Sequence, residues 1–137
     1  MAERKASCSC GKLTVTVEGE PEFISMCHCT ACQKRSGSPF GLAALFPRER
    51  VKIEGPYKSW SRLADSGKRM TNHFCPECGS NVAFEPEIRP GSVAVTIGSF
   101  EDAKFPNPTI SFYTVNKHDW IVVPSGTRIF ETGRRPT

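Results

Sequence analysis

The chain carries seven cysteines in 137 residues, and each belongs to a short local group. In chain order the groups are C-x-C, C-H-C-x-x-C and C-P-E-C: Cys8 and Cys10; Cys27, Cys29 and Cys32; Cys75 and Cys78. In a reducing compartment, so many cysteines in an odd number favour metal binding or thiol chemistry over disulfides. The cysteine pattern therefore constrains the chain more than any other feature.

Residues 75–79, CPECG, have the form of a zinc-binding turn. Zinc prefers four tetrahedral ligands, with Zn–S bonds of about 2.3 Å, and a C-x-x-C turn brings both sulfurs to one metal. The proline fixes φ, and the final glycine can adopt the positive φ that closes the turn. One turn supplies only two ligands. Cys8 and Cys10 would share a face of an extended segment and can supply the other two. We expect a structural metal site of four ligands: Cys8, Cys10, Cys75 and Cys78.

The other three cysteines, Cys27, Cys29 and Cys32, form a local set. Three protein ligands with an open fourth position are typical of a catalytic zinc. A thiolate, a water or a substrate oxygen could bind there, and the metal would lower its pKa. Two alternatives stay open: a site that uses a histidine such as His28 or His73, and reduced cysteines that pack as small apolar residues. His28 would point away from its neighbours in an extended segment and is expected at the surface or behind a ligand.

Apolar and polar residues alternate with the period of β-strands, and helical spacing is nowhere sustained. The expected strands are 12–18, 41–46, 57–63, 69–74, 82–85, 93–100, 110–115, 120–123 and 128–131. One short helix is expected at 30–36. The 11 prolines and 11 glycines fit short strands joined by tight turns, with Trp60 and Trp120 in the core. The predicted class is all-β.

The length predicts a single domain over 1–137, with its core at about 8–130 and a tail at 131–137. No run approaches the roughly 18 apolar residues of a membrane helix. Charged Glu3, Arg4 and Lys5 stand where the apolar part of an export signal would begin, so a cytoplasmic protein is expected.

A formal net charge of +4 favours an anionic small molecule and is too weak to predict nucleic-acid binding. The sequence has no nucleophile elbow, phosphate loop, dinucleotide-binding loop or H-E-x-x-H motif. These absences exclude several common classes of enzyme and leave the cysteines as the candidate chemistry.

The order of the motifs resembles the glutathione-dependent formaldehyde-activating enzyme family, also called the centromere-protein-V-like family. The segments that carry the resemblance are 8–10, 27–38, 74–80, 96–100 and 117–120. The resemblance implies a β-tent fold of several small coiled antiparallel sheets with at most one or two short helices. It also implies one structural zinc on the first and last cysteine groups, and one labile, catalytic zinc on Cys27, Cys29 and Cys32.

The resemblance implies a carbon–sulfur lyase that forms or cleaves S-hydroxymethylglutathione or a similar thiol–aldehyde adduct. Its partner would be a small thiol such as glutathione, whose sulfur would meet the second zinc. The positive charges of Lys34, Arg35, Lys68 and Lys117 could pair with the carboxylates of the tripeptide. The alternative is a non-catalytic zinc-binding interaction module with the same fold. A thiol redox switch built on the same three cysteines is a third, weaker reading.

Overall fold

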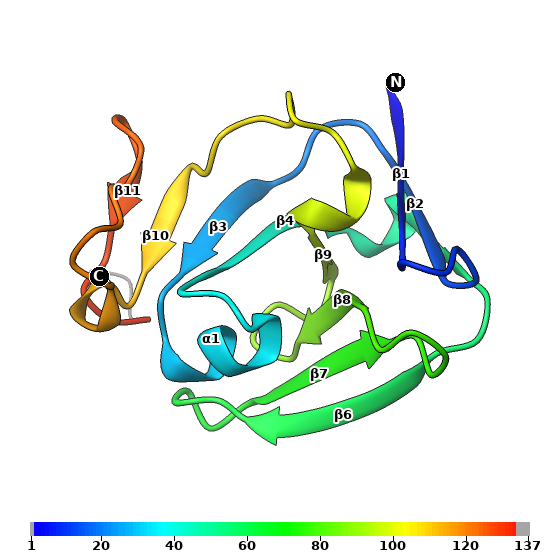
Figure 1. Cartoon of the computed structure of the whole chain (residues 1–137), viewed down its shortest axis with the longest axis horizontal. Helices are drawn as coiled ribbons and strands as arrows, with labels where there is room; N and C mark the ends of the chain where they lie inside the picture. The colour runs from blue at the N-terminus through cyan, green and yellow to red at the C-terminus, as the bar shows by residue number, and fades with distance from the viewer. Residues whose placement is uncertain (1, 134–137) are drawn as a thin grey trace.

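Strands dominate the computed structural model, which describes residues 2–133 (Figure 1). In chain order the strands are β1 Glu3–Ser7, β2 Thr14–Glu18, β3 Phe23–Cys27, β4 Gly41–Pro47, β5 Val51–Glu54, β6 Lys58–Leu63, β7 Arg69–Phe74, β8 Asn81–Pro86, β9 Ser92–Thr96, β10 Ile110–Phe112 and β11 Arg128–Ile129. The helix is α1 Thr30–Ser36, and the 3-10 turns are η1 Arg48–Arg50, η2 Ile97–Phe100 and η3 Thr114–Asn116. No helix among residues 2–133 is long and apolar enough to cross a membrane.

The strands form two sheets. A three-stranded sheet has the order β1-β2-β5, and an eight-stranded sheet has the order β11-β10-β3-β4-β9-β8-β7-β6. Neighbouring strands are antiparallel except β3–β10 and β10–β11, which are parallel. These parallel pairs form because the chain crosses the whole sheet between β3 and β10 before it returns to the β3 edge. The fold is therefore all-β, as predicted, with two parallel pairings that the expected antiparallel sheets lack.

The main core lies between the two sheets. Val15 and Val17 of β2 are fully buried on one face and meet Phe46, Val82 and other apolar side chains of the large sheet. Every second residue of β2 points there because side chains alternate along a strand. A smaller cluster, made by Leu45, Phe84 and their neighbours, covers the opposite face of the large sheet.

Helix α1 lies over this second face. Arg35 of α1 holds its guanidinium 4.8 Å from the ring centre of Phe84 and donates to Asn81 Oδ1 at 2.7 Å. The helix also packs against β4, the strand that follows it in the chain. The helix is thus fixed to β8 by a charged hydrogen bond and a cation–π contact.

Several predicted elements are confirmed, including the helix at 30–36 and the strand at 69–74. The predicted strand 110–115 ends early because Tyr113 has a left-handed backbone, with φ 60°. The strand predicted at 12–18 begins at Thr14 because a turn precedes it, and the one predicted at 93–100 ends at Thr96. The segment 120–123 is no strand. The ammonium of Lys117 donates to the carbonyl of Ile121 at 2.9 Å and holds the chain there in a loop.

Three strands were not predicted: β1, β3 and β5. Their five or four residues are too few for alternation to stand out, and β1 is mostly polar. The expectation that both tryptophans lie in the core is wrong. Trp60 is 60% exposed and Trp120 is 70% exposed. The predicted tail at 131–137 lies partly outside the described residues.

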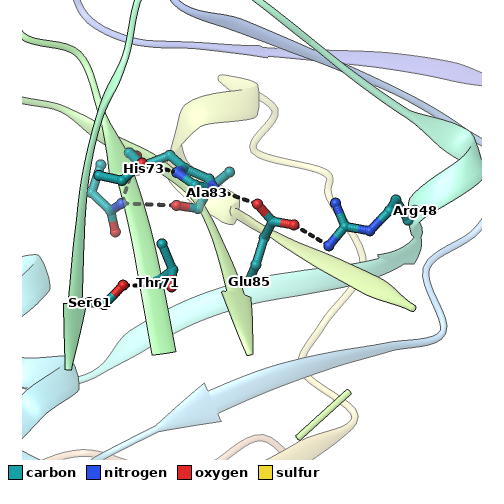
Figure 2. Close-up of polar contacts among 8 residues, drawn as sticks. Arg48, Ser61, Thr71, His73, Ala83 and Glu85 are labelled. Carbon is teal, nitrogen blue, oxygen red and sulfur yellow. Dashed lines mark hydrogen bonds and ion pairs between the residues drawn. The ribbon is translucent and has the colours of Figure 1, made fainter. Parts of the chain in front are cut away.

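A row of polar side chains crosses β6, β7 and β8 on the face toward the main core (Figure 2). The Ser59 hydroxyl lies 2.7 Å from His73 Nδ1, and His73 Nε2 lies 2.5 Å from a carboxylate oxygen of Glu85. Arg48 pairs with the other carboxylate oxygen. Both ring nitrogens of the buried His73 are therefore occupied in this row. His73 belongs to neither cysteine group. The structure therefore does not support the alternative in which His73 is a metal ligand.

Partial burial raises the pKa of Glu85, but the hydrogen bonds from His73 and Arg48 outweigh it and hold the pKa below its ordinary value. A carboxylate with a lowered pKa stabilises the fold above its unfolded pKa of about 4.3, and the stabilisation is lost as the pH falls through the folded pKa. We expect Glu85→Gln to cost about 1–3 kcal/mol at pH 7. The difference from the parent should shrink below about pH 4.

The measurement is urea unfolding of the parent and the variant between pH 3.5 and 7. The difference between the two proteins removes effects that both share, such as protonation of the cysteines. The matched control is Glu54→Gln, because Glu54 is exposed and its nearest charge, Lys52, is 3.9 Å away. An equal, pH-independent loss in both variants would contradict this account of Glu85.

Candidate functional site

The first cysteine group is built by two turns that face each other. One turn follows β1: the backbone N–H of Gly11 donates to the carbonyl of Cys8 at 3.1 Å, and that of Cys8 donates to the carbonyl of Leu13 at 2.9 Å. Gly11 has φ 82°, a conformation that glycine adopts without strain. Cys8 and Cys10 therefore lie in a turn, and the expectation of an extended segment is wrong. The N–H of Leu13 also donates to Cys8 Sγ at 3.3 Å.

The second turn follows β7 and takes the predicted form. The N–H of Gly79 donates to the carbonyl of Cys75 at 2.8 Å, and Gly79 has φ 77°. Ser80 joins the two turns, because its hydroxyl accepts from the N–H of Ser9 at 3.2 Å and lies 3.3 Å from Cys78 Sγ. Each turn thus presents two sulfurs toward the other.

The four sulfurs of these turns, from Cys8, Cys10, Cys75 and Cys78, all lie within 4.8 Å of one another. Cys10 Sγ is 3.6 Å from both Cys8 Sγ and Cys75 Sγ. A tetrahedron with Zn–S bonds of about 2.3 Å has edges of about 3.8 Å, so the sulfurs nearly form one already. Four sulfur donors in this arrangement suit zinc or iron. The group could hold a metal ion.

The charges on these sulfurs are unequal. Hydrogen bonds from the hydroxyl and the backbone of Ser80 lower the pKa of Cys78 to about 5. For Cys10 the N–H of Lys12 acts to lower the pKa, but burial and the neighbouring sulfurs raise it to about 11. A cation that binds all four sulfurs would displace the protons that remain on them.

The second group is centred on the start of α1. Cys27 is the last residue of β3, Cys29 is the N-cap of α1, and Cys32 lies in its first turn. Cys29 Sγ accepts from the N–H of Cys32 and lies 3.4 Å from Cys27 Sγ. All three sulfurs lie within 4.8 Å of one another, and no described histidine or carboxylate joins them. The group could hold a metal through three ligands.

The electrostatics of the second group single out Cys29. Hydrogen bonds from Cys27 and Cys32 lower the pKa of Cys29 to about 2, and the charge of Arg62 acts in the same direction. The pKa of Cys27 is raised, because its proton is held between sulfurs. One thiolate is therefore stabilised by two thiols. All seven cysteines, each within the described residues, are free of disulfides.

His28 is fully buried, so a surface position is wrong for it. Its Nε2 lies 3.0 Å from the hydroxyl of Ser111 in β10, and its backbone N–H donates to the carbonyl of Phe112 at 3.0 Å. Gln33 of α1 donates to the carbonyl of His28 at 2.8 Å. His28 contributes no ligand atom to the group. It fixes the backbone of the C-H-C segment between β10 and α1.

Tyr113 is affected by the charges of Cys27 and Cys29, and the sequence did not indicate a role for it. Its hydroxyl donates to Asp65 Oδ2 at 2.7 Å, which ties the β6–β7 turn to the segment after β10. Burial, Asp65 and the charges of Cys29 and Cys27 raise its pKa to about 12, so the phenol stays protonated. Its left-handed backbone is uncommon for a residue with a side chain, and such strain often marks functional sites.

A pocket of about 400 Å³ lies between α1 and strands β6 and β7. Its lining residues are Ala31, Lys34, Arg35, Trp60, Arg62, Asn72, Phe74, Gly79 and Asn81. A wider, serine-rich cleft of about 830 Å³ lies on the other side of Arg35 and reaches Cys8 and Cys10.

Two of the four predicted cations, Lys34 and Arg35, line the 400 Å³ pocket, whereas Lys68 and Lys117 do not. Lys117 is bound to backbone carbonyls. Arg62 also lines this pocket but was not among the predicted cations. The sequence could have indicated it, because Trp60 and Arg62 are two residues apart in a predicted strand and so share a face.

Known proteins show similarity to this chain at the levels of family, sequence and fold. Residues 3–116 match the family described as glutathione-dependent formaldehyde-activating enzyme. Two curated proteins, both named after that enzyme, are similar over 75 residues: one from Colletotrichum graminicola is 29% identical and one from Penicillium rubens is 25% identical. The match covers 55% of this chain and 39% of each relative, so the chain spans less than half of their length.

A Rhodobacter sphaeroides protein of known crystal structure shares the fold, with a TM-score of 0.59 and 19% identity over 73% of this chain and 90% of that one. The family match covers most of the chain and includes both cysteine groups. The chain belongs to the glutathione-dependent formaldehyde-activating enzyme family.

Proposed function

We propose that the chain is a zinc-dependent carbon–sulfur lyase that forms or cleaves the adduct of formaldehyde, or a similar aldehyde, with glutathione or a similar thiol. One observation carries the proposal: three sulfurs gather at the start of α1 with no fourth described ligand, beside a cationic pocket. Such a site is open to a thiol from solution. The family name supports glutathione and formaldehyde as the first substrates to test.

The two cysteine groups suit two different roles. Cys8, Cys10, Cys75 and Cys78 offer a complete set of four ligands, the arrangement of a structural zinc. Cys27, Cys29 and Cys32 offer three, the arrangement of a catalytic zinc. An ion with three protein ligands is the more labile of the two, and we assign the chemistry to it. Thiolate ligands need reduced cysteines, so a cytoplasmic setting is part of the proposal.

Zinc held by Cys27, Cys29 and Cys32 would lower the pKa of an incoming thiol. Arg62 adds positive potential beside the thiolate. The sulfur attacks the carbonyl carbon, a carbon–sulfur bond forms, and the π electrons move to oxygen. The oxygen takes up one proton, equal to the one that sulfur gave up, so no oxidant or reductant is needed. Cleavage is the reverse.

The assignment of roles predicts losses of stability of very different size in the two groups. Cys75→Ser removes a ligand of the closed site and should lower the free energy of unfolding by more than about 3 kcal/mol, or the melting temperature by about 10 °C or more. Cys29→Ser should cost less than about 1 kcal/mol, because the start of α1 keeps a polar N-cap. Thermal unfolding of zinc-loaded proteins measures both. Equal losses in the two variants would contradict separate structural and catalytic groups.

The same variant tests catalysis. Cys29→Ser should lower the rate of exchange between glutathione and its formaldehyde adduct by about a hundredfold or more, because the metal loses one of three ligands. NMR exchange spectroscopy measures this rate, corrected for the uncatalysed reaction. The control is Lys68→Gln, in an exposed turn, which should react like the parent. A folded Cys29→Ser protein with full activity would refute the proposal.

A second candidate function is an interaction module, favoured by apolar side chains near the carboxyl end. Val115, Trp120, Val122 and Ile129 are 58–85% exposed. They would suit a protein surface, and this reading predicts that both metals are held tightly. If the parent chain shows no catalysed exchange and retains both metals against glutathione, this reading replaces the lyase.

A further inference from the structure

The pocket between α1 and strands β6 and β7 adjoins the three-cysteine group. Ala31, Lys34 and Arg35 come from α1, the helix that also carries Cys29 and Cys32. Arg62 of β6 lines the opposite wall of the same pocket. A molecule whose sulfur reaches the three cysteines can therefore place its other groups in this pocket.

The pocket carries positive charge without a matching negative charge. None of its lining residues is an aspartate or a glutamate. Arg35 is engaged with Asn81 and Phe84. Within the described part of the chain, Lys34 has no ion pair, and the bond of Arg62 is a long one of 3.5 Å to the carbonyl of Leu63. Two cations thus remain available to an anion from solution.

The remaining walls suit the carbon chain of a small molecule. Trp60 is 60% exposed although it stands on the pocket side of β6, and Phe74 lines the same hollow. An exposed tryptophan beside two free cations is typical of a site for a ligand with both an apolar part and a charged group.

The axial distance from Cys29 to Lys34 fits a short peptide. Five helical residues rise about 7.5 Å, at 1.5 Å per residue. Two extended residues span about 7 Å. A thiol and a carboxylate separated by about two residues, as in the cysteine and glycine of glutathione, would match this separation.

We propose that Arg62 and Lys34 bind the carboxylate of the substrate thiol in this pocket, with Trp60 against its carbon chain, so that the site selects thiols that carry a carboxylate. This inference rests on the proposed lyase function, which makes the thiol a substrate. Arg62 and Lys34 act as specificity-determining residues, because a guanidinium and an ammonium bind a carboxylate by charge-assisted hydrogen bonds. Neutral thiols of the same size would bind the three-cysteine group without this gain.

The test uses S-methylglutathione, whose blocked sulfur cannot ionise, so that its binding reports the pocket. Trp60 and Trp120 are the two tryptophans of the chain, and in a Trp120→Phe background the fluorescence comes from Trp60 alone. We expect a saturable change in fluorescence. Arg62→Gln should weaken binding at least tenfold, Lys34→Gln should also weaken it, and Arg62→Lys should recover part of the loss.

Two controls keep the experiment specific. Lys68→Gln removes an equal charge outside the pocket and should bind like the background protein. The glycine amide of S-methylglutathione lacks one carboxylate and should bind the background protein more weakly, with no further loss in Arg62→Gln. Circular dichroism melting checks that each variant is folded.

The outcomes separate this inference from the lyase proposal. The pocket assignment is wrong, and the lyase proposal stands, if the chain catalyses exchange but one of two results is found. Either Arg62→Gln binds S-methylglutathione as well as the background protein does, or the fluorescence of Trp60 does not change. If Trp60 responds and Arg62→Gln weakens binding, but no exchange is catalysed, the carboxylate site stands and the lyase proposal fails.

Discussion

Four sulfurs from two turns, which follow strands of different sheets, converge at one point of the fold. Cys10 and Cys75 are 65 residues apart in sequence, yet their sulfurs lie 3.6 Å apart. One turn ends β1 of the small sheet, and the other ends β7 of the large sheet, so the group fixes the two sheets at one end of the core. A cation bound by the four sulfurs would neutralise their negative charge and so stabilise this junction.

Strand β7 connects this junction to the other parts of the molecule. Its alternate residues serve opposite faces: His73 joins the polar row toward the core, whereas Asn72 lines the pocket and Cys75 follows at the junction. The register between β7 and β8 shifts at His73/Phe74, where the strand leads into the second turn. The junction and the pocket are therefore connected through β7, and Gly79 of the turn after β7 also lines the pocket.

The sequence alone indicated the parts of the site that depend on local chemistry. The C-x-x-C-G turn, its positive φ at Gly79 and the helix at 30–36 follow from short-range rules and are confirmed. The pocket depends on contacts between distant residues: Arg62 comes from β6 and Lys34 from α1, and no local pattern places them together. His28 was misjudged for the same reason, because its burial is decided by Ser111 of β10. Short strands with little alternation, such as β3, were missed because only their neighbours in the sheet define them.

We propose that one metal site is closed and that the other is open to a thiol. Native mass spectrometry of the zinc-loaded chain, with and without glutathione, tests it most directly. We predict two zinc ions per chain. Glutathione should bind to or remove the ion held by Cys27, Cys29 and Cys32. The Cys29→Ser variant should retain one zinc ion, and glutathione should not change its mass spectrum. Two zinc ions that are unchanged by glutathione in the parent, or a response that persists in Cys29→Ser, would contradict the claim.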